Sequence, residues 1–203
     1  MKFKFTSYNQ PELHDAWTKY LSDLDFVSIH QGDILKEPTD CVVSPANSFG
    51  YMDGGIDRLY TNYFGKQLQD NLQYEIQVVH NGELLVGEAI LVPTRNDKIP
   101  YLISAPTMRL PTKLDEKTDN PYLAMRAIIL LIKQGTFRFP LEVVKSISIP
   151  GLCTGVGGVS AEKCAAQVRR AIDDHWLGKF KFPTKYQEAV LPFTNRVVGD
   201  YKQ

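Results

Sequence analysis

The stretch from Cys41 to Asp57 constrains the fold more than any other part of the sequence. It opens with a short apolar run that is typical of a buried strand, and it continues through a polar corner into a loop that contains Gly54 and Gly55. The residues after Gly55 have the pattern of a helix start. A strand, a glycine loop and a helix N-terminus together present backbone N–H groups to an anion. The spacing excludes the two common nucleotide fingerprints, GxGxxG and GxxxxGKS/T.

A second stretch of the same kind lies about a hundred residues further along the chain. Residues 146–149 predict another short strand, residues 151–159 form a glycine-rich loop, and Ser160 begins a helix. Backbone N–H groups from two such loops can hold a diphosphate from both sides. The two strand–loop–helix units therefore predict one shared ligand.

Strands that alternate with helices predict a mixed, mostly parallel central sheet covered on both faces, which is a three-layer α/β/α domain of the α/β class. Residues 88–94 and 101–106 predict a hairpin, and Gly65 interrupts a helical pattern, which predicts two short helices. On these helices three aromatic residues are expected to point into the core: Tyr60, Tyr63 and Phe64.

Later elements carry further expectations. The loop at residues 107–119 is either a flap near the site or a surface excursion, and we favour the excursion. The helix that begins at Asn120 is expected to bury a stripe of four residues, Leu123, Ala127, Leu130 and Leu131. The helix after Ser160 is expected to bury another stripe, Cys164, Val168, Ala171 and Ile172.

Four short motifs follow one another along the chain: Gly32-Asp33-Ile34, Ala46-Asn47-Ser48, Gly54-Gly55-Ile56-Asp57 and Thr154-Gly155-Val156-Gly157-Gly158. Together they resemble the macro domain family, whose members bind ADP-ribose. The similarity covers roughly residues 24 to 176. It implies a single macro domain over residues 1–203, with an N-terminal strand and helix packed onto the sheet and a C-terminal tail as additions.

The resemblance implies roles for the first two motifs. Asp33 would accept a hydrogen bond from the adenine amino group while the Ile34 N–H binds the base, and the alternative for Asp33 is a turn or capping residue. Asn47 would bind the hydroxyls of the terminal ribose, and the alternative is a turn residue that satisfies its own backbone. In the tail, Phe193 is a candidate for stacking on adenine, with simple packing as the alternative.

The third motif contains the best candidate for a general base. The resemblance implies that Asp57 activates or positions a water near the anomeric carbon, with Asn47 as the second catalytic residue. The alternative for Asp57 is a residue of the first helical turn that the helix dipole favours. Asp53 is a weaker candidate for the same role. The remaining expected ligand contacts are Gly54, Gly55, Ile56, Thr154, Gly155, Val156, Gly157 and Gly158.

The fourth motif departs from the family. Many relatives carry an aromatic residue where this chain has Gly157, and that aromatic supports the terminal ribose. Its absence removes one wall of the ribose site, whereas the N–H groups that bind the diphosphate remain. We therefore expect either an enzyme that hydrolyses ADP-ribosyl bonds of proteins, nucleic acids or small ADP-ribose derivatives, or a non-catalytic module that binds ADP-ribose. A third alternative is an unrelated nucleotide-binding protein on the same scaffold.

Composition narrows the remaining classes. Acidic and basic side chains both number 23, so the net charge is zero, which argues against a broad nucleic-acid-binding surface. The absence of a long apolar run argues against a membrane span and favours a cytoplasmic location. The three cysteines have no metal-ligand spacing, so we expect reduced thiols, no metal and no cofactor. A nucleophilic role for Cys153 is not favoured.

Overall fold

The computed structural model describes residues 1–135 and 144–190. Its strands are β1 Lys2–Ser7, β2 Val27–Gln31, β3 Cys41–Ser44, β4 Ile90–Pro93, β5 Tyr101–Ser104 and β6 Ser146–Ile149. Its helices are α1 Pro11–Leu21, α2 Gly55–Phe64, α3 Gln67–Val79, α4 Asn120–Gln134, α5 Ala161–Ala171 and the π-helical turn η2 Ile172–Trp176.

The six strands form one sheet in the order β2-β1-β6-β3-β5-β4. All neighbouring pairs are parallel except β4 and β5, which pair antiparallel as the predicted hairpin. The mixed, mostly parallel sheet is therefore confirmed. Because the parallel strands run in the same direction, their carboxyl ends lie at one edge of the sheet, where ligands of open α/β sheets bind.

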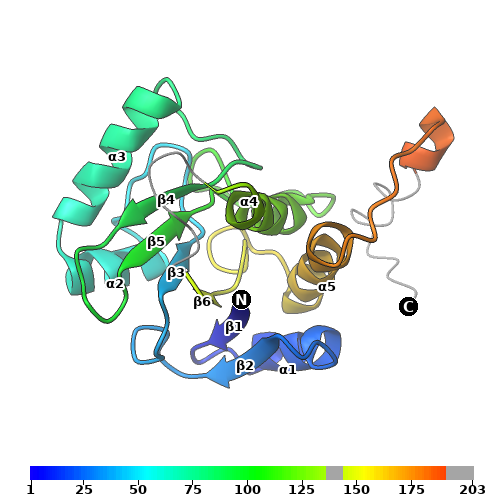
Figure 1. The fold of residues 1–203 in the computed structure, drawn as a ribbon, viewed down its shortest axis with the longest axis horizontal. Coiled ribbons are helices and arrows are strands. Elements are labelled where there is room, and N and C mark those ends of the chain that lie inside the picture. The colour runs from blue at the N-terminus through cyan, green and yellow to red at the C-terminus, as the bar shows by residue number, and fades with distance from the viewer. Residues whose placement is uncertain (136–143, 191–203) are drawn as a thin grey trace.

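Helices cover both faces of the sheet, as Figure 1 shows, with α2 and α3 on one side and α1, α4 and α5 on the other. Side chains along β3 alternate between the two cores. Cys41 and Val43 pack toward α1, α4 and α5, whereas Val42 packs toward α2 and α3. The three-layer α/β/α architecture is thus confirmed, and it results from strands that are apolar on both faces.

The N-terminal strand occupies an interior position in the sheet. β1 pairs with β2 on one side and with β6 on the other, and Phe3 and Phe5 are fully buried. The sequence predicts that this segment packs onto the sheet, but it does not predict that the strand lies between two others. Its pairing with β6 joins residues about 145 positions apart, and such a long-range contact leaves no local signal in the sequence.

Four helix predictions have different outcomes. Gly65 separates α2 from α3 with a φ of 91°, as predicted. Tyr60 lies in the core, but Tyr63 is 41% exposed, so its predicted burial is wrong. α5 buries its predicted stripe. Of the stripe predicted on α4, Ala127 is buried, whereas the three leucines are only partly buried, because the helix is apolar on several sides. The buried residues of α4 are Pro121, Tyr122, Ala124, Met125, Ala127, Ile128 and Ile129.

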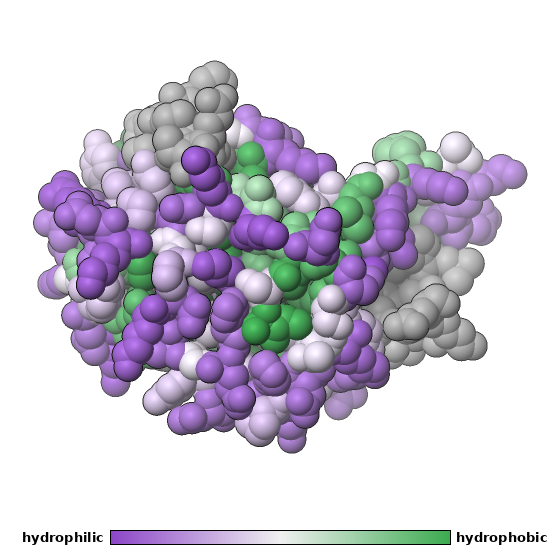
Figure 2. All heavy atoms as spheres, turned by 60° about the horizontal axis from the view of Figure 1, so that its bottom comes forward, coloured by the Kyte–Doolittle hydropathy of each residue, from purple (hydrophilic) through white to green (hydrophobic). Residues whose placement is uncertain are grey.

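The molecular surface is mainly hydrophilic on the face shown in Figure 2, where apolar side chains gather in a limited patch. Beyond η2 the chain projects from the body of the domain, and the described part of the chain finishes with a helical turn at residues 186–190 (Figure 1). Phe193 lies outside the described residues. Among the helices of residues 1–135 and 144–190, none combines the length and apolarity that crossing a bilayer requires.

Candidate functional site

A cleft of about 710 Å³ lies over the carboxyl ends of the parallel strands. Its lining includes residues that follow five of the strands: Tyr8 after β1, Asp33 after β2, Asn47 after β3, Thr107 after β5 and Thr154 after β6. The loop after β3 (residues 45–54, the β3 loop) leads into the N-terminus of α2, which forms part of the wall. The two glycine-bearing loops predicted from the sequence, one with Gly54 and Gly55 and one at residues 151–159, therefore line the same cleft.

Strand order places the expected ligand contacts along a line. Asp33 follows β2, the glycine-rich loop follows β6, and Asn47 follows β3. In the sheet, β1 and β6 lie between β2 and β3. Neighbouring strands are about 4.8 Å apart, so three spacings separate the Asp33 and Asn47 positions by roughly 14 Å. The expected ligand contacts thus extend over three strand spacings, with the loop after β6 (residues 150–159, the β6 loop) between the Asp33 and Asn47 positions.

Asp33 lines the cleft while it also stabilises its own turn. Its Oδ1 accepts a hydrogen bond of 3.0 Å from the Leu35 backbone N–H. One carboxylate oxygen of Asp33 therefore has the turn role that the sequence analysis gives as the alternative. Ile34 is buried and packs in the core beneath α2 and α3, and it lines the same end of the cleft.

Asn47 is 6% exposed and lines the cleft next to β5. Its Nδ2 donates to the Tyr51 carbonyl at 2.9 Å, and its Oδ1 accepts from the backbone N–H groups of Phe49 and Tyr51. The side chain thus satisfies the backbone of its own loop, as the turn alternative expected. A carboxamide has two N–H donors, so one donor is left for a ligand in the cleft.

Asp57 lies in the first turn of α2 and is 7% exposed. Burial raises the pKa of its carboxyl group to about 7, a hydrogen bond from the Ser44 hydroxyl lowers this pKa, and the nearby charge of Asp53 raises it. The Ser44 Oγ and the Asp57 Oδ1 are 2.5 Å apart. A carboxylate with a pKa near 7 can accept a proton at neutral pH, which is the requirement for a general base.

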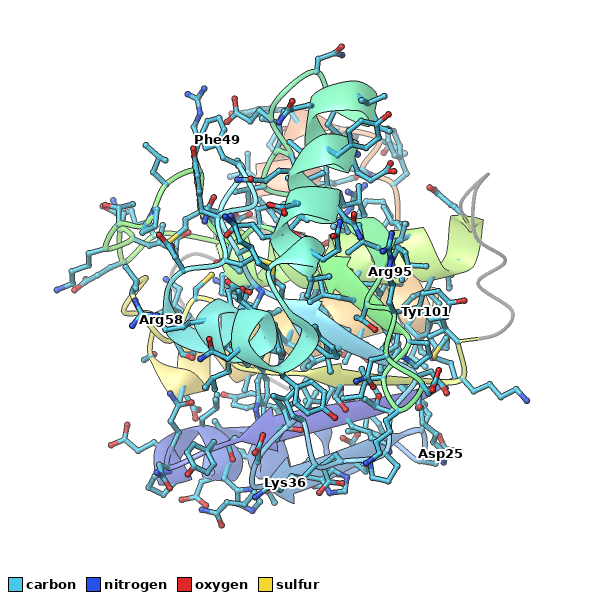
Figure 3. The ribbon with its side chains drawn as sticks, turned by 90° about the vertical axis from the view of Figure 1, so that its left-hand side faces the viewer. Asp25, Lys36, Phe49, Arg58, Arg95 and Tyr101 are labelled. Atoms are coloured by element: carbon cyan, nitrogen blue, oxygen red, sulfur yellow. The ribbon has the colours of Figure 1, made fainter. Side chains whose placement is uncertain are left out.

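The N-terminus of α2 presents backbone N–H groups without a side-chain cap. Gly54 is the cap residue, and Gly55 has a φ of 52°, a left-handed conformation that favours glycine. A Cβ at either position would meet nothing within 4 Å, so the space above this turn is open. Figure 3 views the α2 and α3 layer from outside, where Arg58 extends from the first turn of α2 and donates to the Asp53 carbonyl.

The β6 loop contributes Thr154, Gly155, Val156 and Gly157 to the cleft, whereas Gly158 lies outside the lining. Gly157 has no room for a side chain. A Cβ there would lie 2.7 Å from the Cys153 carbonyl oxygen and 3.2 Å from the Leu114 Cδ1. The backbone of this loop is therefore packed closely against its neighbours at Gly157.

The loop at residues 107–119 lies against the site, and the expectation of a surface excursion is wrong. Thr107, Met108 and Pro111 line the cleft, and the Leu114 N–H donates to the Gly157 carbonyl at 2.9 Å. Thr107 also bonds to the β3 loop, because its hydroxyl donates to the Pro45 carbonyl at 2.9 Å. The loop therefore connects the β3 and β6 loops at one end of the cleft.

Three tyrosines in the cleft lining were not predicted as site residues. Tyr8, Tyr51 and Tyr63 are 63%, 53% and 41% exposed, and each lines the cleft. Tyr8 directly follows β1, so its position would have been evident if β1 had been recognised as an interior strand. The helix periodicity that predicts a buried Tyr63 does not distinguish a side chain that faces the core from one that faces a cleft.

The cysteines are buried, and burial raises the pKa of each thiol well above its usual range. For Cys164 the pKa rises to about 12. Cys153 lies at the cleft, but a thiol with a raised pKa is a poor nucleophile at neutral pH. Within residues 1–135 and 144–190, no three His, Cys, Asp or Glu side chains gather in a way that could hold a metal ion.

The fold and the cleft define a class: an α/β/α domain whose ligand site combines a helix N-terminus with a glycine-rich loop over the carboxyl ends of parallel strands. The model of the Macro-like domain family matches residues 27–184. The chain therefore belongs to the macro-like domain family.

Known proteins resemble the chain in sequence and in fold. An uncharacterized protein of Aquifex aeolicus is 31% identical over 139 residues, which are 68% of this chain and 76% of the relative. A Pantoea vagans protein named O-acetyl-ADP-ribose deacetylase 1 is 28% identical over 142 residues, with coverages of 68% and 76%. An Oceanobacillus iheyensis macrodomain mutant with ADPR has a TM-score of 0.57 at 24% identity and covers 70% of this chain and 73% of its own, a likeness of fold.

Proposed function

We propose that this protein binds ADP-ribose in the cleft and hydrolyses ADP-ribosyl bonds at the terminal ribose. The substrates would be mono-ADP-ribosylated proteins or nucleic acids, or small derivatives such as ADP-ribose 1″-phosphate. The observation that carries the proposal is Asp57, an almost buried carboxyl group with a pKa of about 7 in the lining of the cleft. ADP-ribose as the ligand is supported by the name of the Pantoea vagans relative, O-acetyl-ADP-ribose deacetylase 1, and by the Oceanobacillus iheyensis macrodomain structure with ADPR.

The linear order of contacts fits the parts of this ligand. Adenine would lie near Asp33 at the β2 end, and the diphosphate would lie between the N-terminus of α2 and the β6 loop at the middle. The terminal ribose would then lie near Asn47 at the β3 end. Partially charged N–H groups from two sides would neutralise the diphosphate without a cationic side chain.

Hydrolysis would follow from the position of Asp57. Its carboxylate would take a proton from a water as that water attacks the anomeric carbon of the ribose. The bond from this carbon to the acceptor breaks, and the acceptor leaves with the bonding electrons and receives the proton from Asp57 or from solvent. Asn47 would hold the ribose hydroxyls through its remaining N–H donor.

A module that binds ADP-ribose without turnover is the second candidate function. Two observations favour it: Gly157 lacks the aromatic that many family members carry, and the Asn47 side chain already stabilises its own loop. Both candidates share the same binding mode. They differ only in what happens at the anomeric carbon.

Turnover by site variants distinguishes the two functions. Asp57→Ala should lower turnover by about 10²–10⁴-fold and leave ADP-ribose affinity within a factor of a few, because a general base acts mainly on the transition state. Asn47→Ala should lower both affinity and rate, because its amide orders the loop and the ribose in every state. The measurements are calorimetric titration with ADP-ribose and release of ADP-ribose from mono-ADP-ribosylated protein, nucleic acid and small derivatives. Tight binding without any release would support the binding module and contradict hydrolysis.

A further inference from the structure

Ser44 is the last residue of β3, and its side chain is fully buried beneath the N-terminus of α2. Alternation along the strand turns Val42 and Ser44 toward the α2 side of the sheet. Asp57 comes down from the first turn of α2 to meet it, and the Ser44 Oγ donates to the Asp57 Oδ1 at 2.5 Å. This is a hydrogen bond between a strand and a helix, made in a buried environment.

The two oxygens of Asp57 have different surroundings. Oδ1 is held by Ser44, whereas Oδ2 forms no hydrogen bond within the described residues. Asp57 lines the cleft and is 7% exposed, so its side chain reaches the cleft. A charge-assisted hydrogen bond to one oxygen restricts the orientation of the carboxylate and leaves the second oxygen for a water or substrate in the cleft.

The backbone around Ser44 is itself held firmly. The Ser44 carbonyl accepts from the Ala105 N–H at 3.0 Å, and the next carbonyl, that of Pro45, accepts from the Thr107 hydroxyl. Three residues after Ser44 comes Asn47. The end of β3 thus carries both the residue that holds Asp57 and the residue expected at the ribose.

We propose that Ser44 is a positioning residue for the reaction, whose hydroxyl holds the Asp57 carboxylate with its free oxygen toward the anomeric carbon. This inference rests on the proposed hydrolysis for its kinetic consequence, and on the geometry alone for its effect on Asp57. Two other titratable groups act in this environment. Asp53 lies in the preceding loop, and Tyr60 lies on α2, where burial and then the charge of Asp57 raise its pKa well above the usual value.

The test compares Ser44→Ala with Ser104→Ala. Ser104 is the register partner of Ser44 on β5, is equally buried, and has a hydroxyl without a hydrogen-bond partner in the described part of the chain. Both variants remove one buried hydroxyl, but only Ser44→Ala removes the bond to Asp57. The readouts are the titration of the Asp57 carboxyl carbon by ¹³C NMR and the pH dependence of kcat and KM.

Loss of the Ser44 bond should raise the pKa of Asp57 by about one pH unit, because that bond stabilises the charged form. The low-pH limb of the kcat profile should move to higher pH together with this pKa. At a pH above both midpoints, kcat should remain reduced by about tenfold, because orientation is lost, while KM changes little. Ser104→Ala should change neither the titration nor the profile.

An unmoved Asp57 titration in Ser44→Ala, or an equal shift in Ser104→Ala, would overturn the proposal whether or not the protein is an enzyme. If Ser44→Ala fails to fold, Ser44→Cys carries the test, because a thiol is a weaker donor of similar size. It should shift the titration in the same direction by a smaller amount, and no shift would overturn the proposal. Absence of wild-type turnover with the expected titration shift would contradict the hydrolysis alone.

Discussion

At the scale of single residues, Asp57 combines two opposing influences. Burial favours its neutral form, whereas the hydrogen bond from Ser44 favours its charged form. Burial is the larger of the two, so the folded protein binds this proton more tightly than an unfolded chain does. A helix N-terminus alone would have the opposite effect on a carboxyl group. The arrangement thus keeps a carboxyl group partly protonated at neutral pH.

The stability of the protein should therefore depend on this carboxyl group. The pKa of Asp57 is about 7 in the fold, against 3.8 for an ordinary aspartate. Its contribution to folding is fully present below pH 4 and is lost as the pH rises through 7. Asp57→Asn is neutral at every pH, so its unfolding free energy lacks this pH dependence. The difference in unfolding free energy between the variant and wild type should therefore grow by on the order of 2–4 kcal/mol, in favour of the variant, as the pH rises from 5 to 8. Urea unfolding at the two pH values measures this gain, and a constant difference between the proteins would contradict it.

At the scale of elements, the loop at residues 107–119 determines the shape of one end of the cleft. It bonds to the β3 loop through Thr107 and to the β6 loop through Leu114. Leu114 lies near the space that a side chain at Gly157 would occupy. The glycine and this loop thus fit together, and an aromatic at Gly157 would require both loops to move.

Substitution at Gly157 should therefore cost stability. Gly157→Ala should lower the unfolding free energy by about 1–3 kcal/mol, because its Cβ would meet the Cys153 carbonyl at 2.7 Å. Gly155→Ala is the matched control in the same loop, since a Cβ there meets nothing within 4 Å. Its effect should stay within about 0.5 kcal/mol. Chemical denaturation of both variants measures their unfolding free energies. Equal losses in the two variants would contradict the prediction, because the loop would then accommodate a Cβ at Gly157 by moving.

The sequence predicted those elements whose signals are local. The break at Gly65, the β4–β5 hairpin and the two glycine-bearing loops each depend on residues close together in the chain, and the structure confirms them. The interior position of β1 and the docking of residues 107–119 were missed. Both depend on contacts between segments far apart in sequence, such as Leu114 with Gly157, which no local pattern encodes.

The site could be predicted only in part for the same reason. Motifs named Asp33, Asn47 and Asp57, and the structure places all three in the lining of one cleft. The bond between Ser44 and Asp57 was not predicted, because a serine that ends an apolar strand has no special signature. The proposed roles of these residues in binding and turnover stay predictions.

At the scale of the whole molecule, the proposed binding mode depends on the distance between the Asp33 and Asn47 positions. Three strand spacings separate these positions by roughly 14 Å, and the proposed ligand extends over that distance. ADP-ribose should bind near micromolar Kd, whereas AMP should bind at least about tenfold more weakly, because it reaches only one end of the cleft. Titration calorimetry with both compounds measures the ratio. Equal affinities would contradict the elongated binding mode.

The place of β6 in the sheet has a consequence for how the chain is synthesised. Without β6 the sheet consists of two separate parts, β2-β1 and β3-β5-β4, and β6 lies between β1 and β3. A ribosome releases β6 only after residues 1–145, so a nascent chain carries both partial sheets, each with an unpaired edge. These edges can pair with other chains until β6 emerges. Truncation before residue 146 should therefore yield an aggregating product, and chaperones that cover strand edges should act on this protein before β6 is made.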